Sequence, residues 1–249
     1  MIDSVKISSL LKTRVLGRRI TILDETDSTN AEAMRMLEVE KPPDGLVIMA
    51  EKQTAGRGRR GNAWFSDGGL CMTVVLDAGG RPSGPVAIAA GVGVAEGLTA
   101  ATGRDFFLKY PNDVMSAKTD GKKIGGILAE SKRGFLVIGI GVNIGRASFP
   151  AELAETAASL HQLGVALDKE TAAAAVLNSL EPWLEALKAG KLSLIRERWL
   201  RLNCTIGNRV VVRDVNPPVD GRATGLDADC ALLVETPQGT RRVATGGLS

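Results

Sequence analysis

Cysteine and histidine are scarce in this sequence of 249 residues. The three cysteines, Cys71, Cys204 and Cys230, are odd in number, far apart and without a CxxC pair, which argues against a disulfide framework and a zinc knuckle. A reducing cytoplasm fits this composition. The only histidine, His161, falls in a predicted helix as a surface residue, and no GxSxG motif supports a Ser-His-Asp triad.

Long apolar runs and a strong net charge are missing as well. No stretch of about 18 uninterrupted apolar residues occurs, and the N-terminus lacks the charged-then-apolar layout of a signal peptide. We therefore expect a soluble protein that is not exported and does not bind a membrane. Lysine and arginine number 31 against 28 acidic residues, and this balance is too even for a nucleic-acid coat. An apolar fraction of 44% indicates an ordinary globular core.

The first 150 residues alternate between predicted strands and helices. Thr29 and Glu32, three residues apart, predict a capping box at the start of a helix. An alanine- and glycine-rich segment, 86–101, predicts a buried helix that Gly91 and Gly93 weaken. Apolar runs bounded by turn residues predict strands at 46–50, 70–76, 106–110, 123–130 and 135–144, the last two joined as a hairpin at residues 132–134.

The sequence changes character near Pro150. Amphipathic periodicity predicts helices at 151–163, 169–188 and 193–202. From Gly207 onward, short strands at 210–212, 222–225, 232–235 and 241–244 predict a small β-barrel. We therefore expect a main domain of residues 1–203 and a C-terminal domain of residues 204–249.

The segment Gly56-Arg-Gly-Arg-Arg-Gly61, within residues 53–66, alternates glycines with arginines. Flexible backbone and guanidinium groups in one loop can approach and neutralise a phosphate, which predicts an anion site. A solvated basic turn and an RNA-binding RG segment are the open alternatives. No Gly-Lys-Ser/Thr follows, so a P-loop is disfavoured.

Polar residues interrupt the pattern at three further places. Asn112 and Asp113 follow a proline at a strand end, where a simple turn would also explain them. Lys123 begins an apolar run, where its side chain would either snorkel or point at a ligand. Asn143, in Gly139-Ile-Gly-Val-Asn143, carries an amide that needs partners, which base recognition could supply. The spaced glycines there lack a full dinucleotide-binding fingerprint.

In combination and in order, these motifs resemble those of the biotin protein ligases along nearly the entire chain. The specific part is GRGRRG followed by WFS, and PND followed by KxxGIL. The resemblance implies an α/β catalytic domain with a mixed sheet, like that of class II aminoacyl-tRNA synthetases, and a small C-terminal SH3-like β-barrel. It also implies two half-reactions. Biotin and ATP would form biotinyl-5′-AMP, and the biotinyl group would pass to a lysine of a biotin carboxyl carrier domain of acetyl-CoA carboxylase or a related carboxylase.

The resemblance further implies a site in which Arg59 and Lys123 supply the catalytic cations where a carboxylate attacks the α-phosphate. Asp113, with the pyrophosphate oxygens, would hold Mg²⁺. Asn62 departs from the family pattern, which has a second basic residue there, and Tyr110 replaces a tryptophan. The implied biotin-binding residues are Ser28, Thr29, Asn30, Gln53, Gly56, Arg57, Gly58, Arg59, Lys123, Gly125 and Ile127. The implied nucleotide-binding residues are Arg59, Asn62, Trp64, Asn112, Asp113 and Asn143.

Two other functions stay open at this point: a lipoate–protein ligase-like acyltransferase, and a non-catalytic ligand-binding or RNA-binding paralogue. Retention of Arg59 and Lys123 argues against a degenerate protein, and the arginine motif with the C-terminal strands favours biotin over lipoate. Only about 20 residues precede the predicted α/β core, too few for a winged helix-turn-helix, so DNA binding is not expected. The sequence leaves open whether the protein is a monomer or a homodimer.

Overall fold

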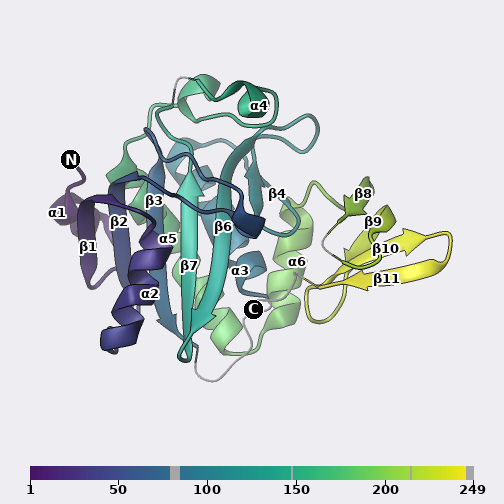
Figure 1. The fold of residues 1–249 in the computed structure, drawn as a ribbon, viewed down its shortest axis with the longest axis horizontal. Helices are drawn as coiled ribbons and strands as arrows, with labels where there is room; N and C mark the ends of the chain where they lie inside the picture. The colour runs from purple at the N-terminus through teal and green to yellow at the C-terminus, as the bar shows by residue number, and fades with distance from the viewer. Residues whose placement is uncertain (79–84, 147, 214, 245–249) are drawn as a thin grey trace.

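A seven-stranded mixed sheet forms the centre of the molecule (Figure 1). The computed structural model describes residues 1–78, 85–146, 148–213 and 215–244. The strand order is β1-β2-β3-β7-β6-β5-β4; β1 and β2 pair in parallel, and the other neighbours pair antiparallel. The predicted mixed sheet is thereby confirmed. The strands are β1 (Ile20–Thr26), β2 (Leu46–Gln53), β3 (Leu70–Asp77), β4 (Phe107–Lys109), β5 (Asp113–Met115), β6 (Lys123–Lys132) and β7 (Phe135–Val142).

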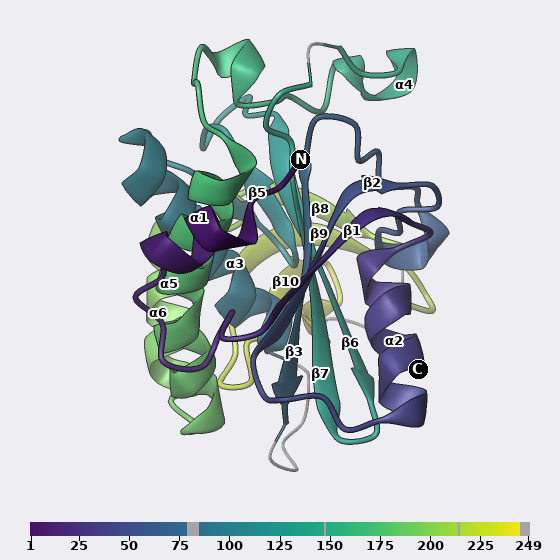
Figure 2. The ribbon, with the colours of Figure 1, turned by 90° about the vertical axis from the view of Figure 1, so that its left-hand side faces the viewer.

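Helices cover both faces of the sheet, which Figure 2 shows nearly edge on. Leu46 and Ile48 of β2 join the apolar cluster under α2, while Val47 and Met49 join the larger core under α3 and α5. Burial on both faces explains why this strand is an unbroken apolar run. The helices are α2 (Thr29–Val39) on one face, α3 (Val86–Thr102), α5 (Lys169–Lys188) and α6 (Leu192–Leu202) on the other, and α1 (Ser4–Leu10) against α5.

Helix α3 lies close against α5 because glycines face the contact. A Cβ atom at Gly93 would lie 2.6 Å from the Cα atom of Leu180, and one at Gly97 would lie 2.7 Å from the Cα atom of Val176. No side chain fits into that space. Gly93, which the sequence suggests as a weakness of the helix, therefore sets the distance between two helices.

The C-terminal residues form a small antiparallel sheet in the order β11-β10-β9-β8. Its strands match the four predicted ones within a few residues: β8 (Arg209–Val212), β9 (Val219–Leu226), β10 (Leu232–Thr236) and β11 (Gly239–Val243). Within the described ranges, no pairing between the outer strands β8 and β11 closes this sheet into the expected barrel. The domain boundary between residues 203 and 204 falls in the connection from α6 to β8 and stays a prediction.

Tyr110 joins the two sheets. Its hydroxyl donates to the carbonyl of Val243 at 3.0 Å and accepts the N–H of Leu232 at 3.2 Å. Its ring meets that of Trp199 edge to face, with centroids 6.0 Å apart. Burial raises the pKa of Tyr110 to about 12. The small sheet is therefore bonded to the main domain through a side chain at the edge of the main sheet.

The helix predicted over residues 151–163 is wrong. The chain forms only the short helix α4 (Ala151–Ala154) and the 3₁₀ turn η2 (His161–Leu163), with an extended segment between them. In that segment the carbonyl of Thr156 accepts the N–H of Lys123 at 2.8 Å, and the N–H of Ala158 donates to the carbonyl of Lys123 at 3.0 Å. Backbone pairing with the start of β6 therefore overrides the amphipathic pattern.

Several features bear on the surroundings of the protein. Cys71, Cys204 and Cys230 are all free thiols. His161 is exposed as expected, but it lies in the turn η2 and not in the predicted helix. Among the described residues, we find no helix that combines the length and the apolar character needed to cross a membrane.

Candidate active site

A cavity of about 270 Å³ lies between the start of α2, strands β6 and β7, and the arginine loop, which we define as residues 54–66. Gly56, Gly125 and Asn143 lie outside its lining. The fold nevertheless gathers most of the predicted site, from separate parts of the chain, around one space. The predicted residues that line it are Ser28, Thr29, Asn30, Gln53, Arg57, Gly58, Arg59, Asn62, Trp64, Asn112, Asp113, Lys123 and Ile127.

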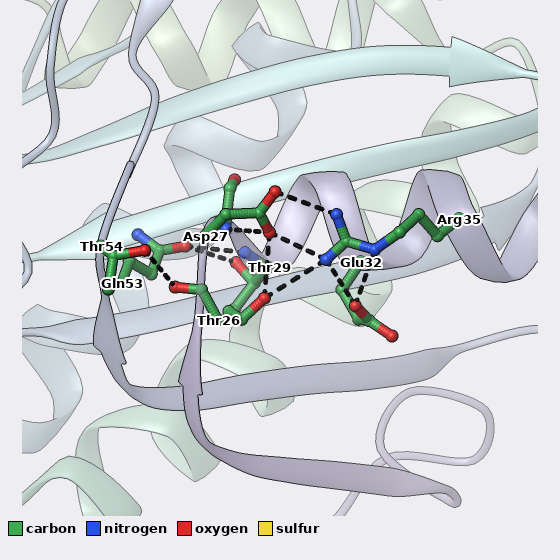
Figure 3. A network of polar contacts seen from close by, with 8 residues as sticks. Thr26, Asp27, Thr29, Glu32, Arg35, Gln53 and Thr54 are labelled. Atoms are coloured by element: carbon green, nitrogen blue, oxygen red, sulfur yellow. Dashed lines mark hydrogen bonds and ion pairs between the residues drawn. The ribbon is translucent and has the colours of Figure 1, made fainter.

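The first turn of α2, where Figure 3 shows Thr29 beside Gln53, builds a polar end of the cavity. Ser28 and Thr29 are each only 4% exposed. The N–H and the hydroxyl of Thr29 donate to Gln53 Oε1 at 2.8 and 3.1 Å. The buried Thr73 hydroxyl donates to the Thr29 hydroxyl at 2.8 Å. These bonds fix the Thr29 and Gln53 side chains through neutral partners.

Helix α2 begins at Thr29 as predicted, but the predicted capping box does not form. Ser28 is the N-cap residue and makes no side-chain capping bond. The Glu32 carboxylate accepts instead from Arg35, at 2.6 and 3.0 Å. Because the Thr29 hydroxyl is bonded to Gln53, the group expected to cap the helix belongs to the cavity.

The arginine loop folds back on itself beside the cavity. The N–H of Gly58 donates to the carbonyl of Asn62 at 2.7 Å, and the N–H of Trp64 donates to the carbonyl of Gly56 at 2.8 Å. A Cβ atom at Gly56 would lie 2.5 Å from the carbonyl oxygen of Trp64. Gly56 therefore permits a close backbone contact within the loop, which explains its place outside the cavity lining.

Positive charge gathers at the opposite end of the cavity from Thr29. Arg59 Nη1 donates to Asn112 Oδ1 at 3.4 Å. Arg57 lies on the α2 side instead, because its Nη2 is 3.6 Å from Oε2 of Glu130, which also accepts from Asn30 Nδ2 at 2.7 Å. Burial and the neighbouring charge of Arg59 both lower the pKa of Arg60. The guanidinium groups of Arg59 and Arg60 suit an anion beside them.

Lys123 places its ammonium at the cavity, as one of the two interpretations of the sequence predicts. Its Nζ lies 2.6 Å from Asp113 Oδ1 and 5.8 Å from the centre of the Trp64 ring. The two charged side chains are 33% and 26% exposed, so each is partly desolvated. The arrangement presents a cation that is paired within the protein and accessible from the cavity.

Asp113 is the only carboxylate among the described residues that line the cavity. The described ranges also contain no group of three or more His, Cys, Asp or Glu side chains able to hold a metal ion. Enzymes commonly hold Mg²⁺ through one or two carboxylates together with phosphates of the substrate. A single carboxylate at the cationic end of the cavity therefore fits a magnesium ion that arrives with a nucleotide, and does not fit a resident metal.

Glycines of β7 form a floor on which Trp64 lies. A Cβ atom at Gly141 would lie 2.4 Å from the indole ring, and one at Gly139 would lie 2.4 Å from Asn30 Oδ1. Gly126 of β6 pairs with Gly141 in the ladder and also lines the cavity. Because alternate residues of a strand face the same side, the spacing Gly139-x-Gly141 is the sequence signal for this floor.

Two predicted residues take other places. Gly126 lines the cavity in place of its neighbour Gly125, where a Cβ atom would meet the carbonyl oxygen of Gly141 at 2.8 Å and the Val142 side chain at 3.6 Å. Asn143 is buried, and its amide donates to the carbonyls of Ala158 at 3.2 Å and Lys123 at 3.4 Å. Backbone carbonyls thus account for this amide, and contact between Asn143 and a nucleotide stays a prediction.

The sequence gives no signal for several apolar lining residues, such as Cys71 and Met72 of β3. Only the ladder, in which Cys71 pairs with Gly141 and Met72 with Ile140, brings them to the floor. Burial raises the pKa of the Cys71 thiol to about 11, so it stays protonated and is a weak nucleophile. The remaining unpredicted lining residues are Arg60, Ala63, Tyr110, Pro111, Leu128 and Ile140.

Two family models match the chain. The biotin/lipoate A/B protein ligase family matches residues 22–145, and the biotin protein ligase C terminal domain matches residues 205–247. The first match contains every residue that lines the cavity, and the second contains the small antiparallel sheet.

Similar proteins cover most of the chain. It is 35% identical to the biotin–acetyl-CoA-carboxylase ligase of Mycobacterium tuberculosis, over 92% of this chain and 88% of that protein. It is 32% identical to the bifunctional ligase/repressor BirA of Bacillus spizizenii, over 94% of this chain and 74% of that protein. The biotin protein ligase from Aquifex aeolicus in complex with biotin and ATP has a TM-score of 0.82 and 27% identity, and the match covers 92% of this chain and 97% of that one. Because motifs, fold and relatives agree along most of its length, the chain belongs to the biotin protein ligase family.

Proposed function

We propose that this chain activates biotin with ATP and then biotinylates a lysine of a biotin carboxyl carrier domain. In the first step a biotin carboxylate oxygen attacks the α-phosphorus, and pyrophosphate leaves as the bond to it breaks. In the second step the lysine amine attacks the acyl carbon, and AMP leaves. The observation that carries the proposal is one cavity with a neutral polar end at Thr29 and Gln53 and a cationic end at Arg59 and Lys123.

The cationic end suits the first step. A carboxylate and a phosphate repel each other, and charge grows on the phosphate oxygens as the new bond forms. Lys123 Nζ and the Arg59 guanidinium would lie beside those oxygens and stabilise the transition state more than the separate substrates. Lys123 must then exchange its 2.6 Å contact with Asp113 for a substrate oxygen.

The neutral end suits the fused ring system of biotin. Its ureido group offers two N–H donors and one carbonyl acceptor and carries no charge. Ser28, Thr29 and Gln53 supply matching hydroxyl and amide groups in fixed positions, and the glycine floor with Trp64 offers flat surfaces to the ring. Asn30, Arg57, Gly58 and Ile127 complete the proposed biotin side of the lining.

The nucleotide would occupy the side of the cavity near Asn112, Asp113 and Asn62. Asn62 offers an amide where the family pattern has a second cation, so Arg59 and Arg60 would carry more of the triphosphate charge. Mg²⁺ entering with ATP would neutralise phosphate charge beside Asp113. Trp64 would cover the adenylate, because a mixed anhydride is readily hydrolysed by water.

A reducing cytoplasm is part of the proposal. The three free thiols, two of them buried, fit a compartment without disulfide formation. Similarity to the biotin–acetyl-CoA-carboxylase ligase of Mycobacterium tuberculosis supports a carrier domain of acetyl-CoA carboxylase or a related carboxylase as the acceptor.

Mass spectrometry of a carrier domain incubated with this protein, biotin and MgATP tests the proposed function. We expect one biotinyl group on one lysine, and none when ATP is omitted. A parallel reaction with lipoate in place of biotin tests the closest alternative. Lipoylation without biotinylation would replace the proposal, and formation of no adenylate with either acid would leave a binding protein.

A further inference from the structure

Arg35 forms a bidentate ion pair with Asp27 just outside the cavity (Figure 3). Its Nη1 and Nη2 donate to Oδ2 and Oδ1 of Asp27 at 2.9 and 2.8 Å. Glu32, one turn earlier on α2, accepts from Nε and Nη2 of Arg35 at 3.0 and 2.6 Å. The guanidinium plane is thus held from two sides, and Arg35 keeps the pKa of the Asp27 carboxyl well below its usual range.

Asp27 in turn contacts both chain segments that lead into the cavity. Its Oδ1 accepts the N–H of Ser28 at 2.7 Å, and its main-chain carbonyl accepts the N–H of Ala55 at 2.9 Å. Ser28 is the N-cap residue of α2, and Ala55 directly precedes Gly56 in the arginine loop. Asp27 therefore holds both the start of α2 and the start of the arginine loop.

We propose that Arg35 is a positioning residue for biotin binding and that it acts through Asp27. Loss of Arg35 leaves the Asp27 carboxylate able to turn toward solvent, away from the N–H of Ser28. The spacing between Thr29 and the arginine loop is then less well defined before binding. Biotin must order these groups itself, which weakens its affinity. The inference rests on the proposed function, since it names a residue that supports the biotin end of that cavity.

A second surface arginine shows what an ordinary ion pair looks like in this protein. Arg201 on α6 donates to Glu197, four residues earlier on the same helix, at 2.6 Å, with the side chains 67% and 63% exposed. A pair of this kind contributes little to stability. Arg35 is 51% exposed, but its contact joins α2 to the connection that precedes the helix. The two arginines therefore form a matched pair for substitution.

The test compares Arg35→Gln with Arg201→Gln in the full chain, by calorimetric titration of biotin and by biotin-dependent pyrophosphate exchange. We expect Arg35→Gln to raise the dissociation constant and the KM of biotin about threefold to tenfold. The KM of ATP, and kcat at saturating biotin, should change by less than about twofold. Arg35→Lys keeps the charge but lacks the bidentate geometry, so its values should fall between those of wild type and Arg35→Gln. Arg201→Gln should match wild type in every constant.

The outcomes separate this inference from the proposed function. Failure of the wild-type protein to bind biotin would reject the proposed function itself. Wild-type biotin affinity in Arg35→Gln, or an equal loss of biotin and ATP affinity, would reject the positioning role alone. If Arg35→Gln does not fold, Asp27→Asn replaces it, because an asparagine keeps an acceptor for the N–H of Ser28 but cannot form the ion pair. An unchanged biotin KM in Asp27→Asn would then overturn the proposal.

Discussion

The side chains at the two ends of the cavity are held by different kinds of contact. At the α2 end, neutral groups of Thr29 and Gln53 bond to each other within a buried network. At the other end, charged groups are paired within the protein, most closely Lys123 with Asp113 at 2.6 Å. Neutral bonds can persist when a ring system binds beside them, whereas an ion pair must open for its cation to reach a phosphate. Variants at the neutral end should therefore change affinity, and variants at the cationic end should change rates.

Lys123→Gln should have the largest effect, because it removes the ammonium charge from the cationic end of the cavity. If the ammonium stabilises charge that grows between carboxylate and α-phosphate, its removal should slow adenylation by about 10²–10³. Biotin-dependent exchange of labelled pyrophosphate into ATP reports this step without a carrier. Because the loss is expected in the transition state, kcat for exchange should fall further than the biotin dissociation constant rises. An exchange rate within about threefold of wild type in a folded variant would make Lys123 a structural residue.

Arg59→Gly should have the next largest effect, on retention of the intermediate. The substitution removes a charged hydrogen-bond donor from the arginine loop, worth about 10–150-fold in retention of biotinyl-5′-AMP. Adenylate should still form, and should leave the protein faster. Rapid filtration of protein preloaded with labelled adenylate measures its release rate in the variant and in wild type. A release rate equal to that of wild type would show that Arg59 does not contact the adenylate.

Much of the fold could be predicted because its signals are local. Apolar runs bounded by turns marked β2, β3, β6 and β7, and short strand patterns with turn residues between them marked the C-terminal strands from Gly207 onward. The failures lie where tertiary contacts decide. Residues 151–163 have a helical pattern, yet their middle pairs with β6. Strand β5 (Asp113–Met115) is too short for any periodicity and exists because it pairs with β4 and β6.

The residues of the candidate site also divide into those that local sequence predicts and those that tertiary contacts decide. Motif residues such as Lys123 and Trp64 could be predicted because their types are out of place or occur in a recognisable order. Strand faces could not, since Gly125 and Gly126 differ only in register. Arg35 lies in no motif, and its contact with Asp27 follows from the geometry of the turn before α2, which no periodicity describes.

Thr29→Val should have a smaller effect, confined to the neutral end. Valine keeps the shape and removes a hydroxyl that bonds Gln53 and Thr73, leaving buried polar atoms with fewer partners. We expect biotin affinity to fall about fivefold to tenfold, with the KM of ATP unchanged. Thr171→Val, which removes an exposed hydroxyl bonded to Asp168, is the matched control. Equal losses for biotin and ATP would contradict the division between the two ends.

Tyr110→Phe should have the smallest effect on catalysis, because both hydrogen bonds of its hydroxyl go to the C-terminal sheet and the phenyl ring is kept. Loss of two hydrogen bonds should lower the free energy of unfolding by about 1–2 kcal/mol.

The same tyrosine gives the stability of the protein a specific dependence on pH. Folding raises the pKa of Tyr110 to about 12 from an ordinary value near 10. The protonated form is thus favoured in the folded state, and its contribution is complete below about pH 10 and is lost as the pH rises through 12. Since the chain contains one tyrosine, the near-ultraviolet absorbance of tyrosinate follows this residue alone. A titration midpoint near that of free tyrosine in the folded protein would show that the hydroxyl is not bonded between the two sheets.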